Sequence, residues 1–220
     1  MISLTKTVLC LAPFCALIGG CHSNASSPDQ IRTQFIQAVA ADDFTQMSAL
    51  LDKTGGYQAI RLGDRYDTPE SQKDPMLRGE AIIMWAIRTG HFKPVLALVG
   101  RTPAVKNDFG RTPLMYAALY GPEVGPDQSL MSVVLQSPDK QLSAVDNNGD
   151  SALLMALRRG APNAAGWLLR AGAPIAIGRN WIRNKRGQSA LDLAVASKNS
   201  WCITLVTERA KLAGLPLQTR

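Results

Sequence analysis

Short apolar runs recur along the chain, and each follows a glycine and a Thr or Ser. The clearest copy is Asn107–Ala118, and related copies occupy Asp146–Leu157 and Asn184–Ala194. In each copy a Gly is followed by Thr or Ser two residues later, by Leu two further on, and by Ala three after that. Because Leu and Ala at this spacing share one face of a helix, the pattern predicts a short helix that packs on one side.

The residues before each apolar run are typical of a turn that leads into a helix. The Gly permits a positive φ. Thr112, Ser151 and Ser189 are placed to cap the helix N-terminus. Pro113 follows Thr112 at the first helical position, where its missing N–H costs nothing.

A second Gly and a second helix complete the unit. Gly121 and Gly160 lie 11 residues after the first Gly of their copies, and Gly79 and Gly90 keep the same spacing. A following helix is clearest within 164–173. A degenerate copy is expected over 35–51, as two amphipathic helical segments around Asp42-Asp43.

Together these features resemble the ankyrin repeat, whose pattern is G-x-T-P-L-H-x-A-A-x-x-G followed by L-L-x-x-G-A. The usual His is replaced by Met115, Leu154 and Asp192, and Lys198 stands at the second Gly of the last copy. The resemblance implies an all-α solenoid of about five helix-turn-helix repeats over residues 31–217, with degenerate terminal repeats. A generic bundle of helical hairpins with incidental glycines is the alternative, and three copies in one internal order weigh against it.

The N-terminus predicts export and lipid anchoring. Residues 1–20 hold one charge, Lys6, and an apolar run that is too short to span a bilayer and is typical of a signal peptide. Gly19-Gly20-Cys21 resembles the bacterial lipobox, which implies lipidation of Cys21; an ordinary signal peptide with an incidental Cys is the alternative. Residues 21–30 would then be a lipidated tether, and His22, in place of Asp, points to the outer membrane with the domain facing the periplasm.

The cysteine count and the charge distribution bear on the role of the remaining thiol and on the class of partner. With Cys21 lipidated, Cys202 is the one thiol left in the mature chain, and its apolar surroundings predict a buried structural role. Residues 101–220 hold 15 basic and 8 acidic side chains. The basic half could meet anionic lipid head groups or an acidic protein surface, or could be a solvated face. Because the chain is expected to be exported, no nucleic-acid partner is expected.

Catalytic motifs are missing from the sequence. It holds two histidines, His22 in the tether and His91 at a predicted turn, and no G-x-S-x-G, H-E-x-x-H, C-x-x-C or phosphate-binding glycine loop. We therefore expect a protein that is not an enzyme and binds no cofactor or metal.

Irregular spacing marks the candidate binding segments. An ankyrin unit usually spans about 33 residues, whereas Gly110 to Gly149 is 39 residues and Gly149 to Gly187 is 38. The surplus falls at 122–128 and 174–186, and a third long connection runs over 54–78. Aromatic and Arg side chains dominate interface energetics, so the predicted partner-binding residues are Tyr57, Arg61, Arg65, Tyr66, Tyr116, Tyr120, Arg179, Trp181, Arg183 and Arg186. Trp181 could instead fold back and cover the stack.

Location and architecture suggest a monomeric, membrane-anchored module that binds a protein partner. The leading hypothesis is an immunity protein that inhibits a periplasm-acting toxin, such as a phospholipase effector of a type VI secretion system. The main alternative is an envelope adaptor or a partner of a periplasmic enzyme. An effector secreted toward a host and a lipid-binding protein are further alternatives.

Overall fold

The computed structural model describes residues 27–53, 60, 62–66, 68–122 and 130–217 of the 220-residue chain. Most of these residues are helical, which confirms the predicted all-α class. The helices come in consecutive pairs: α1 (Pro28–Ala40) with α2 (Phe44–Lys53), α5 (Ile82–Thr89) with α6 (Phe92–Leu98), α7 (Pro113–Tyr120) with α8 (Leu130–Val134), α9 (Ala152–Arg159) with α10 (Pro162–Arg170), and α11 (Ala190–Ala196) with α12 (Ser200–Leu212).

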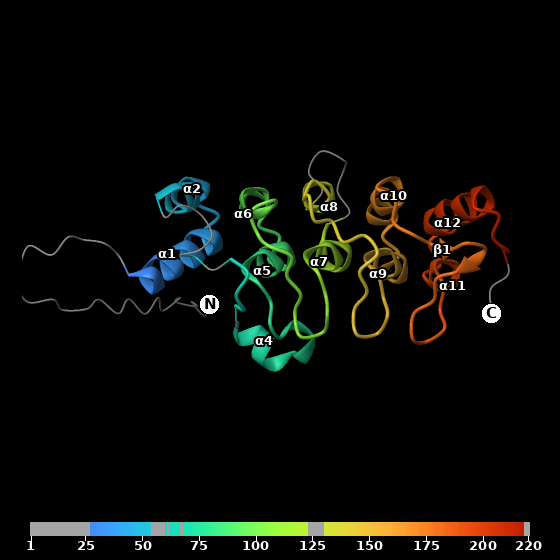
Figure 1. Ribbon diagram of the computed structural model, residues 1–220, viewed down its shortest axis with the longest axis horizontal. Coiled ribbons are helices and arrows are strands. Elements are labelled where there is room, and N and C mark those ends of the chain that lie inside the picture. The colour runs from blue at the N-terminus through green and yellow to red at the C-terminus, as the bar shows by residue number, and fades with distance from the viewer. Residues whose placement is uncertain (1–26, 54–59, 61, 67, 123–129, 218–220) are drawn as a thin grey trace, which may run out of the picture.

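The pairs stand side by side in two rows (Figure 1). The first helix of each pair lies in one row, here called the inner row, and the second helix lies in the outer row. Loops that lead into α7, α9 and α11 project beyond the inner row, and we call these loops the fingers. Each helix therefore contacts its own partner and the helices of adjacent pairs, so the stack is built from nearest-neighbour contacts.

Local sequence signals set where the inner helices begin. Thr112, Ser151 and Ser189 each accept a hydrogen bond at the side-chain oxygen from the backbone N–H three residues later, as predicted. The three finger glycines that precede these caps have φ between +75° and +76°. The turn-and-cap unit thus forms as the sequence predicts, because each of its contacts is local.

The backbone conformation at the second glycine position varies more between copies than the sequence suggests. Gly160 ends α9 with φ of +71°, but Gly121 ends α7 with φ of −58°. A side chain at Gly121 would collide with the carbonyl oxygen of Ala117. Lys198, which stands at the second Gly position of the last copy, has φ of +58°. The turn between the last two helices therefore keeps the left-handed geometry without a glycine.

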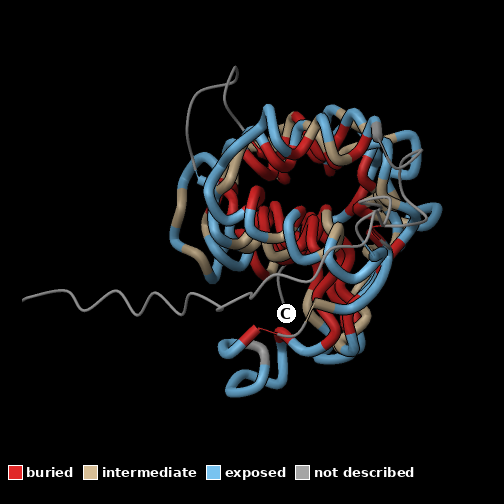
Figure 2. Tube along the Cα trace, turned by 90° about the vertical axis from the view of Figure 1, so that its left-hand side faces the viewer, coloured by how far each residue is buried: buried red, intermediate tan, exposed pale blue. Residues whose placement is uncertain are grey.

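The core fills the space between the two rows (Figure 2). One continuous cluster of buried side chains extends from Phe35 in α1 to Leu215 after α12. Ala117, Ala156 and Ala194 in the inner row are buried, and their small side chains allow close packing. Cys202 is buried in α12, which confirms its predicted burial.

The insertions differ in structure. Part of the 54–78 connection forms α4 (Pro69–Lys73) and a short 3-10 helix, η1 (Pro75–Leu77). The 174–186 insertion contains a small antiparallel hairpin, β1 (Ala176–Ile177) and β2 (Asn180–Trp181), in which Ala176 pairs with Trp181. The 122–128 insertion lies outside the described residues apart from Pro122.

Helix α1 begins at Pro28, within the segment 21–30 that was predicted as a tether. Ser27 caps α1 in a reciprocal capping box with Gln30, so the helix takes in the last residues of the predicted 21–30 segment. The predicted signal peptide and Cys21 lie outside the described residues.

Candidate functional site

A buried Asn or Asp at an equivalent position stabilises the turn of each finger. Asn107, Asp146 and Asn184 each use Oδ1 to accept hydrogen bonds from the backbone N–H groups two and four residues later, over 2.8–3.0 Å. The backbone N–H of each of these residues also donates to the carbonyl oxygen four residues later. These contacts fix the shape of all three fingers in the same way.

Backbone hydrogen bonds join one finger to the next. The N–H of Asp108 donates to the carbonyl oxygen of Arg78 over 3.0 Å, that of Asn147 to Phe109 over 2.9 Å, and that of Lys185 to Asn148 over 3.0 Å. These hydrogen bonds join the fingers into one continuous row along the stack, and we call this row the finger ladder.

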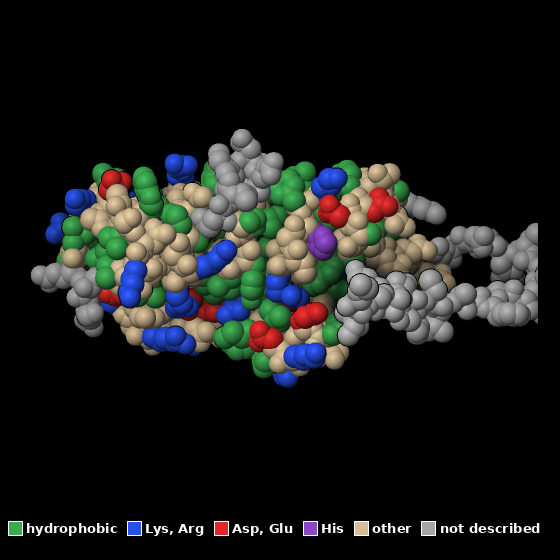
Figure 3. Space-filling view, turned by 180° about the vertical axis from the view of Figure 1, so that it is seen from behind, with side chains coloured by type: hydrophobic (Ala, Val, Ile, Leu, Met, Phe, Trp, Pro, Cys, Tyr) green, Lys and Arg blue, Asp and Glu red, His purple; other side chains and the backbone are tan. Residues whose placement is uncertain are grey.

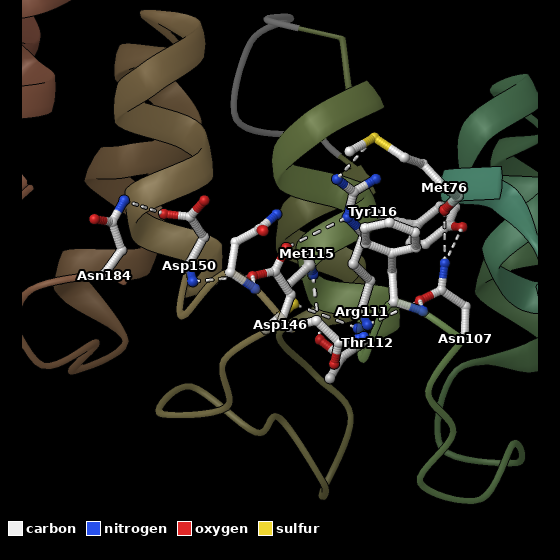
Figure 4. A network of polar contacts seen from close by, with 12 residues as sticks. Met76, Asn107, Arg111, Thr112, Met115, Tyr116, Asp146, Asp150 and Asn184 are labelled. Carbon is white, nitrogen blue, oxygen red and sulfur yellow. Dashed lines mark hydrogen bonds and ion pairs between the residues drawn. The ribbon is translucent and has the colours of Figure 1, made fainter. Parts of the chain in front are cut away.

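Tyr116 belongs to a buried polar network and not to the surface (Figure 4). Its side chain is 0% exposed, and its hydroxyl accepts a hydrogen bond from Nδ2 of Asn107 over 3.0 Å. Burial raises the pKa of the Tyr116 phenol, and the nearby Glu80 carboxylate raises it further. The prediction that Tyr116 contacts a partner is therefore wrong, because α7 turns this side chain toward the interior.

Two buried carboxylates hold arginines at the ends of inner helices. Glu80 accepts from Nε and Nη2 of Arg88 over 2.9 and 3.0 Å. Asp150 accepts from Nη1 and Nη2 of Arg158 over 2.6 and 2.7 Å. In both copies the acid directly follows a glycine of positive φ, Gly79 or Gly149, and the Arg lies eight residues after the acid. Burial alone would lower the pKa of Arg88, but the hydrogen bonds and charge of Glu80 outweigh it and raise that pKa.

A third buried pair is less well satisfied. Nε of Arg111 lies 3.7 Å from Oδ2 of Asp146, and neither atom has a hydrogen-bond partner. Both side chains are almost fully buried. Nη2 of Arg111 donates to the sulfur of Met76 over 3.6 Å. This pair is therefore held mainly by charge attraction.

Aromatic side chains form two groups, one around Trp85 in α5 and one around Tyr120 in α7. Tyr66 packs edge-on against Trp85 with ring centroids 5.3 Å apart, and Trp85 lies 5.6 Å from His91. Tyr120 is 36% exposed and lies 5.5 Å from the ring of Tyr116. Burial raises the pKa values of the Tyr66 and Tyr120 phenols.

We define the inner face as Tyr66, Trp85, Arg88, Tyr120 and Arg158. On the side of the molecule drawn in Figure 3, Lys and Arg side chains lie among hydrophobic ones across the middle and lower part of the view. The sequence-based prediction included Tyr66 and Tyr120 but missed Trp85, Arg88 and Arg158. The acid-to-Arg spacing of eight, present in two copies, was the signal that could have found the arginines.

Arg65 is tied to the finger ladder. Its Nη2 lies 2.6 Å from Oδ1 of Asp108, although the side chain remains 69% exposed. The carbonyl oxygen of Arg65 accepts from Nη2 of Arg32 over 2.9 Å. These contacts fasten the segment before α4 to both α1 and the first finger. Tyr57 and Arg61, from the same predicted site, lie outside the described residues.

The predicted site at 179–186 lies at the C-terminal end of the stack. Nε1 of Trp181 donates to the carbonyl oxygen of Pro216 over 2.9 Å, and its half-buried ring packs against the core. Nη1 of Arg183 lies 2.8 Å from Oδ2 of Asp192. Arg179 and Arg186 are exposed. The hairpin thus covers the last helix pair, and the structure does not bring it together with the inner face.

The described residues contain no group of three His, Cys, Asp or Glu side chains placed to hold a metal ion. Across the same residues, no helix has the length and apolar character needed to cross a membrane. No family model matches the chain, and a search of curated proteins also gives no match.

Proposed function

We propose that the chain is an ankyrin-type solenoid that binds a protein partner on its inner face. The equivalent finger turns, the capped inner helices and the two-row stacking support this assignment. Such a stack offers an extended surface built from several repeats, which suits recognition of another macromolecule.

The observation that carries the proposal is the presence of Trp85, Tyr66, Tyr120 and Arg88 on or beside the neighbouring helices α5 and α7. Trp, Tyr and Arg are the residue types that dominate binding energy at protein interfaces. Arg88 is held in place by its two hydrogen bonds to buried Glu80, so little side-chain freedom remains to be lost on binding. A partner with an exposed acidic and aromatic surface would match this face.

The proposed biological role is immunity against a toxin that acts in the periplasm. Lipidation at Cys21 would hold the chain on the periplasmic side of the bacterial outer membrane. There it would meet an incoming effector, such as a type VI secretion phospholipase, beside its lipid substrate. Binding by the inner face would block the toxin's active-site cleft or a movement needed for catalysis.

A competition assay between sister strains tests the role. A strain that lacks this gene should be killed by a toxin-delivering sister strain, and the wild-type gene should restore survival. The double variant Trp85→Ala/Tyr120→Ala should fail to restore it, since each hot-spot truncation costs about 2 kcal/mol or more of binding energy. The matched control is Leu96→Ala, which truncates an exposed side chain in the outer row.

Two results would count against the proposal, and a third would show that a variant is misfolded. Survival of the deletion strain would reject immunity and favour the adaptor role. Full protection by the inner-face variant would reject the binding face. Failure of the control would point to loss of folding, so the thermal unfolding of each variant is measured beside the competition.

A further inference from the structure

The outer row carries an aromatic and basic surface that is separate from the inner face and whose Trp167 also packs against the core. Trp201, at the start of α12, is 70% exposed. It borders a hollow between α10 and α12 with Trp167, Arg170 and Leu205. Trp167 and Arg170 also border a second hollow, toward α8, together with Lys140. We call Trp167, Arg170, Trp201 and Lys140 the outer patch.

The outer patch combines an exposed indole with positive charge. The guanidinium carbon of Arg170 lies 5.8 Å from the centre of the Trp167 ring. Helices α8 and α10 contain no acidic residue, α12 contains Glu208 against Arg209 and Lys211, and exposed Asp139 directly precedes Lys140 in the loop after α8. Tryptophan favours the interfacial zone of a bilayer, where its ring is buried and its N–H stays hydrated. Basic side chains near an anionic lipid surface add attraction.

We propose that the outer patch docks on an anionic phospholipid surface. Trp201 enters the interfacial zone, and Arg170 and Lys140 contact lipid phosphates. This inference goes beyond the proposed function and does not require lipidation of Cys21. The charge of the patch and the high exposure of Trp201 favour a lipid surface over a protein groove.

Docking in this way leaves the inner face accessible. The outer row and the fingers lie on opposite sides of the stack (Figure 1). A chain that rests on lipid through α10 and α12 therefore directs its fingers away from the bilayer. The surface proposed to bind a partner and the surface proposed to bind lipid can be occupied at the same time.

Tryptophan quenching in vesicles tests the proposal on the full chain. Vesicles of phosphatidylcholine with or without phosphatidylglycerol carry bromine on their acyl chains, which quenches an indole that enters the bilayer. The N-terminal apolar segment could itself hold the chain on vesicles, so the readout is which tryptophan is quenched and not how much protein binds. Wild-type protein is compared with Trp201→Phe and with the matched control Trp85→Phe.

The expected result is quenching in anionic vesicles that Trp201→Phe removes in large part and Trp85→Phe leaves unchanged. Arg170→Gln should weaken the quenching, by up to about fivefold in apparent affinity for the anionic surface, and high salt should act in the same direction. Equal quenching in wild type and Trp201→Phe would overturn the proposal. Quenching that is the same without phosphatidylglycerol, or shielding of Trp201 only by a protein partner, would also overturn it.

Discussion

The buried pair of Arg111 and Asp146 allows a sharp test of how charge stabilises the stack. Asp146→Asn keeps Oδ1, which accepts the two finger hydrogen bonds, as Asn107 and Asn184 do in the neighbouring fingers. It removes the charge that faces Nε of Arg111 at 3.7 Å. Coulomb attraction at this distance is about 4.5 kcal/mol at an effective dielectric constant of 20. Desolvation offsets part of that attraction, and removal of one partner from a buried pair costs about 3–5 kcal/mol.

The double-mutant cycle has three variants: Asp146→Asn, Arg111→Met and both together. Each single variant leaves a buried group without its partner, whereas the double variant leaves no buried charge. We therefore expect each single change to lower the free energy of unfolding by about 3 kcal/mol and the double change to cost less than the sum of the two. Urea unfolding at neutral pH gives these free energies, and similar m-values would show that the denatured state is comparable.

Additive single effects would refute the reasoning. So would a change of less than about 1 kcal/mol for Asp146→Asn, because that result would mean that the pair is screened despite its burial. The control is Asp139→Asn, which removes an exposed charge in the loop after α8. Its effect should stay within about 0.5 kcal/mol.

Two further predictions concern pH and the fingers. The Tyr116 phenol has a raised pKa in the folded chain, so its contribution to stability is complete below the unfolded value of 10.0 and is lost as the pH rises above it; Tyr116→Phe should flatten the fall in urea midpoint above about pH 10, and an unchanged slope would contradict this. Gly149 and Gly187 both have φ of +76°, but a Cβ at Gly149 would lie 3.0 Å from the backbone N of Lys185, whereas one at Gly187 meets nothing within 4 Å. Gly187→Ala should lower the stability by about 1–2 kcal/mol from backbone strain alone, and Gly149→Ala should lower it more, as measured by thermal unfolding. Equal losses of stability would show that the finger backbone near Gly149 can shift at little cost.

The sequence predicted the parts of the structure that depend on near neighbours. The caps at Thr112 and Ser189 and the finger glycines need only residues a few positions away. The choice between Tyr116 and Tyr120 could not be made in this way, because both lie on α7. The packing of α7 buries Tyr116, and a hydrogen bond from Asn107 satisfies its hydroxyl there.

The candidate site was also predicted only where contacts between near neighbours determine it. The length of the 174–186 segment predicted an extra loop, and a hairpin is present. Its place against the chain end depends on the contact of Trp181 with Pro216, 35 residues away, which spacing alone cannot show. Trp85 was overlooked because its importance comes from its contact with Tyr66, which belongs to a different segment.

The finger ladder has a consequence for how such a protein can change over time. Adjacent fingers in the ladder are joined by main-chain hydrogen bonds, which the N–H groups of Asp108, Asn147 and Lys185 donate. An acid, an amide and a base occupy these equivalent positions, so the main-chain hydrogen bond does not depend on which side chain is present. Substitutions at these finger positions can therefore accumulate one at a time without loss of the fold. The side chains of the fingers can therefore vary while the helices that the fingers join stay the same.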